Sequence, residues 1–198
     1  YFGGPWNNGF RAHTIETELK QAVAQGRADM ATMSEIQGNT ASSLGALFTD
    51  AMLASLDYAA ALSAPTDPAD QRIATLYQAE ASAIDEVKAR LAAWRDGGYR
   101  TPSGVATFYD EVATGDAEDS VATTLFNAWL PRVISGTFDD EGLPGIFQPG
   151  GSHGRIRALR KFLAGRGSGN PGGLASYDSA TGESVFFDRL DTAEVAAE

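Results

Sequence analysis

Residues 67–98, DPADQRIATLYQAEASAIDEVKARLAAWRDGG, decide the fold class because they contain both ends of a long helix. Asp67 can cap the helix start, Pro68 suits the first helical position, and Asp70 faces the positive end of the helix. Apolar residues then recur at helical spacing until a glycine pair marks the end. The predicted inward face consists of Ile73, Leu76, Ile84, Val87, Leu91 and Trp94.

The chain ahead of this stretch shows the same helical spacing of apolar residues. It predicts three helices, over about residues 11–26, 29–37 and 44–64, with Pro65 ending the third. The third is rich in alanine, which indicates close contact with neighbouring elements. The expected inward residues are Ile15, Leu19 and Val23, then Met30, Met33 and Ile36, and then Leu44, Leu47, Phe48, Ala51, Leu56 and Ala59.

Two more helices are predicted after an irregular stretch. Asp116 or Asp119 is expected to cap the first, and Pro131 should kink it. A loop rich in glycine and proline over 136–151 then leads to a basic helix that Ser152 can cap. The expected inward residues of the first of these helices are Val121, Leu125, Trp129 and Val133.

The expected fold of this stretch is therefore mainly α, with short β elements near both ends. Residues 1–10 are predicted to form a strand or turn, 11–165 a helical region, and 166–198 a loop, a β-hairpin and the start of a further helix. The sequence opens with Tyr1 and closes within a helix-like run, so a longer parent protein is expected.

Composition narrows the function classes. The net charge of −11 over 198 residues repels phosphate backbones, so nucleic acid is not an expected partner. Cysteine is absent, which excludes disulfides, thiolate metal sites and a cysteine nucleophile within this sequence. No apolar run approaches the roughly 20 residues that span a bilayer, so no membrane partner is expected either.

Two glycine-rich motifs resemble catalytic signatures without their context. Residues 150–154, GGSHG, match G-x-S-x-G, but a nucleophile elbow needs a preceding strand and a later histidine, and none follows His153. A helix cap is the favoured interpretation. Residues 165–169, GRGSG, follow a predicted helix and run into Pro171, so a loop is favoured over a phosphate site.

Charged groups offer weaker candidates. His13 and His153 are the only histidines and lack partners at ligand spacing, so zinc has no support. The acidic run 139–141 is favoured as a solvated loop over a calcium site. For the basic helix, a solvated surface is favoured over a local interaction face. Its basic residues are Arg155, Arg157, Arg160 and Lys161.

One further segment carries a family resemblance. Residues 5–8, PWNN, are followed by 11–16, RAHTIE, and physically this is a turn leading into a helix. The pair resembles the penicillin amidase family of N-terminal-nucleophile hydrolases, in which an asparagine-bearing strand end precedes an arginine that opens a helix. Similar family segments follow in order at 29–37 (DMATMSEIQ), 91–97 (LAAWRDG), 120–130 (SVATTLFNAWL) and 177–184 (YDSATGES).

The resemblance implies a fragment of the large (β) subunit of an αββα amidohydrolase. Such enzymes mature by self-cleavage, and an N-terminal serine with its own α-amine as base attacks the amide. Tyr1 is no nucleophile, so the serine is expected upstream. Asn7 would supply an oxyanion donor, and Arg11 would orient the amine and the asparagine.

Other expectations follow from the same resemblance. The partners would be the rest of the β-subunit, a small α-subunit from the same precursor and a small-molecule amide substrate. The location would be periplasmic or secreted. No cofactor is expected, and a structural calcium would have its ligands elsewhere in the full protein. Two alternatives stay open: an acyl-homoserine lactone acylase of the same family, and a non-catalytic helical interaction or scaffold domain.

Overall fold

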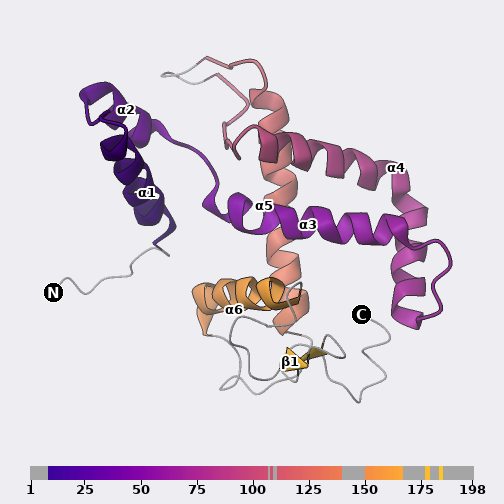
Figure 1. The fold of residues 1–198 in the computed structure, drawn as a ribbon. Helices are drawn as coiled ribbons and strands as arrows, with labels where there is room; N and C mark the ends of the chain where they lie inside the picture. The colour runs from indigo at the N-terminus through magenta and orange to yellow at the C-terminus, as the bar shows by residue number, and fades with distance from the viewer. Residues whose placement is uncertain are drawn as a thin grey trace.

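The computed structural model describes residues 9–106, 108, 111–139, 150–166, 177–178 and 183–184. This described part of the chain is mainly helical, and Figure 1 shows its arrangement. Its elements are α1 (Phe10–Ala24), α2 (Met30–Gly38), α3 (Ser43–Ala61), α4 (Pro68–Asp96), α5 (Asp116–Phe138), α6 (Gly151–Arg166), β1 (Tyr177–Asp178) and β2 (Glu183–Ser184).

Three long helices form the body of the molecule. α3 lies along the second half of α4, and α5 crosses behind them (Figure 1). α6 packs on the far end of α5 and also contacts α3. α1 and α2 form a helical hairpin at the side, where α1 contacts α3.

The core lies where α3, α4 and α5 meet. Phe48 from α3, Leu91 and Trp94 from α4, and Phe126 from α5 are almost fully buried. The ring centroids of Trp94 and Phe126 are 5.4 Å apart. α3 approaches so closely that a Cβ at Gly45 would lie 2.6 Å from Trp94 Cη2. Glycine at this position therefore allows α3 to pack onto the indole ring.

The predicted start and end of α4 are confirmed, but its inward face is only half right. Asp67 Oδ1 accepts a hydrogen bond from the Asp70 N–H at 3.2 Å, as expected of a cap. Glu80 has non-helical angles (φ −128°, ψ 21°), which kink the helix. Leu91 and Trp94 after the kink are buried, whereas Leu76 before it is 61% exposed. Neither proline nor glycine marks the kink, so the sequence held no local signal for it.

The expected cap and loop of α5 need correction. The N-cap is Gly115 in the left-handed conformation (φ 92°), and Asp116 is the first helical residue. α5 contains Pro131 and continues to Phe138, and the kink expected at this proline stays a prediction. Residues 136–138 are therefore helical and not part of the predicted loop. Gly115 takes the cap because glycine adopts positive φ without strain.

The predicted inward face of α5 is offset by one position from the fully buried row, although Trp129 and Val133 of the predicted face do pack against the core. The buried residues are Ala122, Phe126 and Leu130, while Val121 is 44% exposed. Two adjacent apolar rows run along this helix, and both have the four-residue spacing used to predict the face. The contacts with α4 and the packing of the shared core select the row that contains Phe126.

The α1–α2 hairpin buries little of its expected face. Met30 is 86% exposed and Val23 is 66% exposed, although both were predicted to point inward. The buried positions are instead Ala22 and Thr32. α1 contacts both α2 and α3, and the two buried positions of the hairpin carry small side chains. For α3, by contrast, Phe48 and Ala59 of the predicted face are buried.

The C-terminal part of the chain is described in pieces. α6 begins at Gly151, so Ser152 lies inside the helix and is not its cap. β1 and β2 pair antiparallel, with Tyr177 opposite Ser184. The residues around these two short strands, like those before Gly9, lie outside the described part. The predicted β elements and the predicted division into segments therefore stay predictions.

Among the described residues, no helix combines the length and the apolar character that crossing a membrane requires.

Candidate functional site

Arg11 is the one predicted site residue that the structure describes, since Asn7 lies outside the described residues. Arg11 is the second residue of α1 and is exposed. Its Nη2 donates a long hydrogen bond of 3.5 Å to the Gln37 carbonyl in the last turn of α2. This hydrogen bond satisfies a carbonyl in the last turn of α2, which has no hydrogen-bond donor within its own helix. Arg11 thus links the two helices of the hairpin.

The start of α1 follows from a turn at Gly9. Gly9 is the N-cap in the left-handed conformation (φ 76°), and its carbonyl accepts from the His13 N–H at 2.8 Å. Phe10 then packs against the core. The turn predicted from Asn8-Gly9 is thus seen at its second residue, and it fixes where α1 begins.

A groove of about 640 Å³ opens beside this turn. α1, the segment between α2 and α3, the start of α3, Tyr99 and Arg160 of α6 line it. Phe10 and Leu47 contribute apolar surface, and His13 contributes an imidazole. Thr14 Oγ1 and Ser43 Oγ lie 2.9 Å apart, a hydrogen bond that joins α1 to α3. The groove therefore combines apolar walls with groups that can bind a polar ligand.

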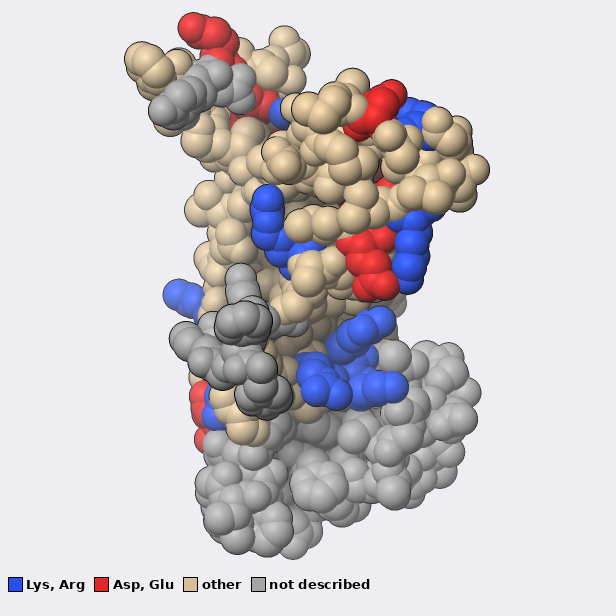
Figure 2. All heavy atoms as spheres, turned by 90° about the vertical axis from the view of Figure 1, so that its left-hand side faces the viewer, with Lys and Arg blue, Asp and Glu red and all other residues tan. Residues whose placement is uncertain are grey.

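The basic face of α6 borders the groove. Figure 2 looks onto this side and shows Lys and Arg side chains gathered just above the grey region. Arg155 Nη2 pairs with Asp139 Oδ1 at 2.7 Å, and its guanidinium lies 6.0 Å from the Phe138 ring centroid. The other three basic residues are exposed and have no ion pair within the described part of the chain. They are Arg157, Arg160 and Lys161.

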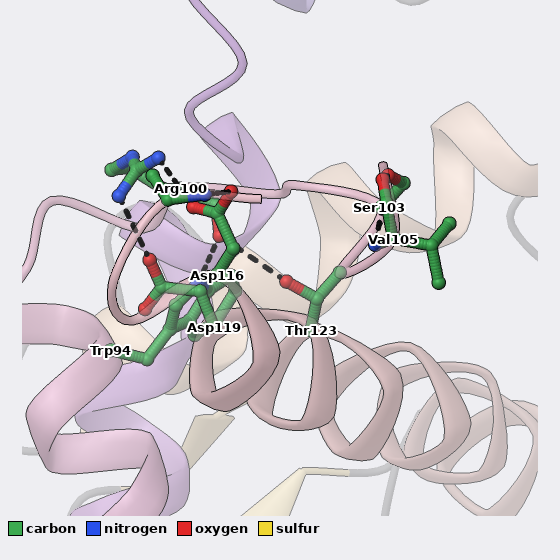
Figure 3. A network of polar contacts seen from close by, with 8 residues as sticks. Trp94, Arg100, Ser103, Val105, Asp116, Asp119 and Thr123 are labelled. Atoms are coloured by element: carbon green, nitrogen blue, oxygen red, sulfur yellow. Dashed lines mark hydrogen bonds and ion pairs between the residues drawn. The ribbon is translucent and has the colours of Figure 1, made fainter. Parts of the chain in front are cut away.

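A second polar cluster, around Arg100, was not predicted (Figure 3). Arg100 Nη2 lies 2.8 Å from Asp116 Oδ1, and Nη1 lies 3.5 Å from Asp119 Oδ2. The Arg100 carbonyl accepts from Trp94 Nε1 at 2.6 Å and from the Thr123 hydroxyl at 3.3 Å. The cluster therefore fastens the chain after α4 to the first turns of α5.

Asp116 shows that this cluster is structural. Its side chain is only 8% exposed. Oδ2 accepts from the Ala113 N–H at 2.8 Å, while Oδ1 faces the guanidinium of Arg100. Both oxygens are occupied by protein donors, so neither is directed at a ligand. The acidic first turn of α5 was visible in the sequence, but its partner Arg100 was not.

The family comparison covers almost the whole chain. The model of the penicillin amidase family matches residues 1–196, which include Asn7 and Arg11. The chain belongs to the penicillin amidase family. This family consists of hydrolases, and membership supports an amidohydrolase-related role. Comparison with curated proteins gave no match, and neither did comparison with solved structures.

The remaining candidates of this penicillin amidase chain are now placed. His13 lines the groove, and His153 is exposed in α6. Asp139 contacts Arg155 and Ser135, and these hydrogen bonds lower the pKa of its carboxyl. Within the described residues, no cluster of three or more acidic or histidine side chains is suited to hold a metal ion.

The two glycine-rich motifs and the basic helix lie partly within the described residues. The glycine-rich motif spans the start of α6, and residues 140–149 before it lie outside the described residues. The motif at 165–169 begins within the last turn of α6. Arg157, Arg160 and Lys161 are solvated, as predicted, whereas Arg155 is held against α5.

Proposed function

We propose that the chain is part of an N-terminal-nucleophile amidase that cleaves the acyl–amide bond of penicillin-like or other N-acyl substrates. The observation that carries this proposal is the family match over residues 1–196. The match includes the short segment 6–11, where Trp-Asn-Asn precedes the arginine that opens α1. The nucleophilic serine is proposed to lie upstream of Tyr1.

The proposed reaction is an acyl transfer to that serine. Its hydroxyl proton passes to its own α-amine while the oxygen attacks the amide carbonyl. The side-chain amide of Asn7 donates to the oxyanion of the tetrahedral intermediate. Collapse expels the amine, which takes the proton, and water then hydrolyses the acyl ester to a carboxylic acid. Asn7 acts on the charge that develops in the transition state.

Arg11 is proposed to position the α-amine and Asn7. Its place in the first turn of α1, three residues after Asn8, supports this role. The only hydrogen bond of its side chain among the described residues is the 3.5 Å contact with Gln37, so other guanidinium donors remain available. The planar fork of donors suits a positioning role.

Maturation by self-cleavage and export of the protein are proposed as well. The chain would belong to the β-subunit of a heterodimer that a precursor forms by self-cleavage, together with a small α-subunit. Export to the periplasm would accompany this maturation. An acyl-homoserine lactone acylase would use the same mechanism and differ only in the acyl group and amine that it accepts.

The test uses the full-length, self-processed protein with phenylacetyl and long-chain acyl chromogenic amides. Asn7→Ala should lower kcat by a factor on the order of 10²–10³, because one oxyanion donor is lost. Asn8→Ala is the matched control and should retain most activity. Circular dichroism and a thermal melt check that both variants remain folded.

Two outcomes would contradict the proposal. One is a full-length protein that never self-cleaves, and the other is an Asn7→Ala variant as active as the parent. Either would favour the alternative of a helical interaction or scaffold domain. The preferred acyl group is read directly from which of the two substrates is cleaved.

A further inference from the structure

We propose that the groove beside α1 and the basic face of α6 together form a docking surface for an acidic polypeptide segment of a partner protein. The carboxylates of that segment would pair with Arg157, Arg160 and Lys161, and a neighbouring apolar side chain would enter the groove. The two halves of the surface meet at Arg160, which lies on α6 and also lines the groove. This inference does not depend on amidase activity.

The basic face of α6 is an array of cations on a helix that is already anchored. Arg157, Arg160 and Lys161 stand at i, i+3 and i+4, so they share one side of the helix, and all three are exposed. Ile156 and Leu159 are buried on the other side, where α6 contacts α5 and α3. The cations are therefore turned to solvent before any partner binds.

Most other cations in the described part of the chain already have a carboxylate partner. Lys88 pairs with Asp57 and Arg90 pairs with Glu86, for example, whereas the three cations of this α6 face have no ion pair within the described residues. Carboxylates are in excess in a chain with a net charge of −11. These cations thus stay open to carboxylates from another molecule, which arginine can bind through two parallel hydrogen bonds.

The groove supplies the apolar half of the surface. Its volume is about 640 Å³, and its lining includes Phe10, Leu47 and Tyr99. Each of these side chains is half-buried, with one part packed against the core. An apolar side chain of a partner would remove their remaining exposed surface from water, which favours association.

One carboxylate in the groove sets the direction of the bound segment. Glu18 lies on α1, and its Oε1 accepts a hydrogen bond from Asn39 Nδ2 near the α2 side of the lining. It would repel the carboxylates of the partner, whereas Arg160 on α6 attracts them. The acidic residues of the segment are therefore expected over α6, with the apolar side chain next to them in the groove.

The charge of the whole chain favours a short acidic segment over an extended anionic surface. A membrane of anionic lipids or a nucleic acid would also face the acidic remainder of the chain, and the net charge of −11 opposes that approach. A short segment meets only the local field of the α6 cations. Charges more than roughly 8 Å away are largely screened at physiological salt.

The binding test uses fluorescence anisotropy with the full-length protein. The probe is a short labelled peptide in which one phenylalanine stands between two pairs of aspartates. Arg160→Gln should weaken its binding about tenfold, because a charge-assisted contact is lost. Arg72→Gln is the matched control, since Arg72 is exposed and without an ion pair among the described residues but lies in the first half of α4. It should leave the affinity unchanged.

Two further comparisons test the charged and the apolar half separately. A peptide with asparagines in place of the aspartates should bind more weakly than the acidic peptide and should not respond to Arg160→Gln. Ala46→Leu adds bulk to the groove from an exposed position of α3. It should weaken the phenylalanine peptide but not a peptide with alanine at that place. Thermal melts check that the protein variants remain folded.

Four results would overturn the inference. One is a parent protein that does not bind the acidic peptide. Another is equal weakening by Arg160→Gln and Arg72→Gln, which would indicate a general charge effect. A third is binding to phosphatidylserine vesicles without binding to the peptide, which would assign the basic face to a membrane. The last is competition between the peptide and a cleaved amide, which would assign the groove to the active site.

Discussion

The body formed by α3, α4 and α5 and the hairpin formed by α1 and α2 are built in different ways. The body buries large side chains almost completely, among them Phe48, Trp94 and Phe126. The hairpin buries only Ala22 and Thr32. Its attachment to the body combines Phe10, which packs against the core, with the hydrogen bond between Thr14 and Ser43.

Because of this difference, most of the folding stability and the candidate site lie in different parts of the molecule. Burial of large apolar groups is the main driving force for folding, so most of the stability resides in the body. Arg11, His13 and the groove lie on or beside the hairpin, where fewer apolar contacts restrain the backbone. Binding surfaces are commonly drawn from such less stable regions, positioned by a rigid scaffold.

The largest expected effect is the loss of folding stability when a buried side chain of the body is truncated. Leu91→Ala in α4 should lower the free energy of unfolding by about 2–5 kcal/mol, because Leu91 is fully buried and its truncation leaves a cavity. Leu19→Ala in α1 should cost clearly less, since Leu19 is only half-buried. Urea unfolding of the two variants measures both values.

Leu76→Ala is the control for this pair. Leu76 lies in α4 like Leu91 but is 61% exposed, so its truncation should change stability by less than about 0.5 kcal/mol. A cost for Leu19→Ala equal to that of Leu91→Ala would show that the hairpin is as tightly packed as the body, and the comparison would not hold.

A smaller effect of opposite sign is expected inside the body. Thr49 is fully buried in α3, and its hydroxyl has no hydrogen-bond partner among the described residues. Thr49→Val keeps the branched shape and removes the unsatisfied hydroxyl, so stability should rise by about 1 kcal/mol. Thr17→Val serves as the control, because the Thr17 hydroxyl is exposed and donates to the His13 carbonyl. A destabilised Thr49→Val variant would indicate that the hydroxyl has a partner.

The smallest expected effect is a pH-dependent loss of stability of α2 in the hairpin. The hydrogen bond from the Thr32 N–H, 2.8 Å from Asp29 Oδ1, lowers the pKa of the Asp29 carboxyl. Because the folded pKa is below the unfolded value near 3.8, the cap stabilises α2 fully above that pH. The stabilisation is lost as the pH falls through the folded pKa.

Hydrogen exchange between pH 5 and pH 3 measures this loss. Protection of the α2 amides should fall with pH, relative to amides in the second half of α4. Asp29→Asn caps without titrating in this range, so the pH dependence of the α2 protection factors, which correct for the intrinsic pH dependence of exchange, should disappear. An unchanged pH dependence in that variant would assign the effect to another group.

The sequence predicted most elements but fewer of their faces. The start of α4 was readable from Asp67 and Pro68, because caps and proline act through local backbone geometry. The buried row of α5 was not readable, since the rows of Val121 and Ala122 satisfy the same spacing. The kink at Glu80 and the pairing of Arg100 with Asp116 have no local marker in the sequence.

The candidate site divides in the same manner. The segment around Asn7 and Arg11 was found from the sequence because its residue types and spacing resemble the penicillin amidase family, to which the chain belongs. The groove could not be found in that way. Arg160 is almost 150 positions after Phe10 in the sequence, and only the packing of α6 near α1 and α3 places both in one lining.

The sequence alone therefore determined the helical class, most helix boundaries and the family, because periodicity, capping and short motifs are local properties of the chain. Only the tertiary structure decided which apolar row of each helix is buried, where α4 bends and which distant cation borders the groove. Burial and close packing among α3, α4, α5 and α6 are collective and leave no local mark in the sequence.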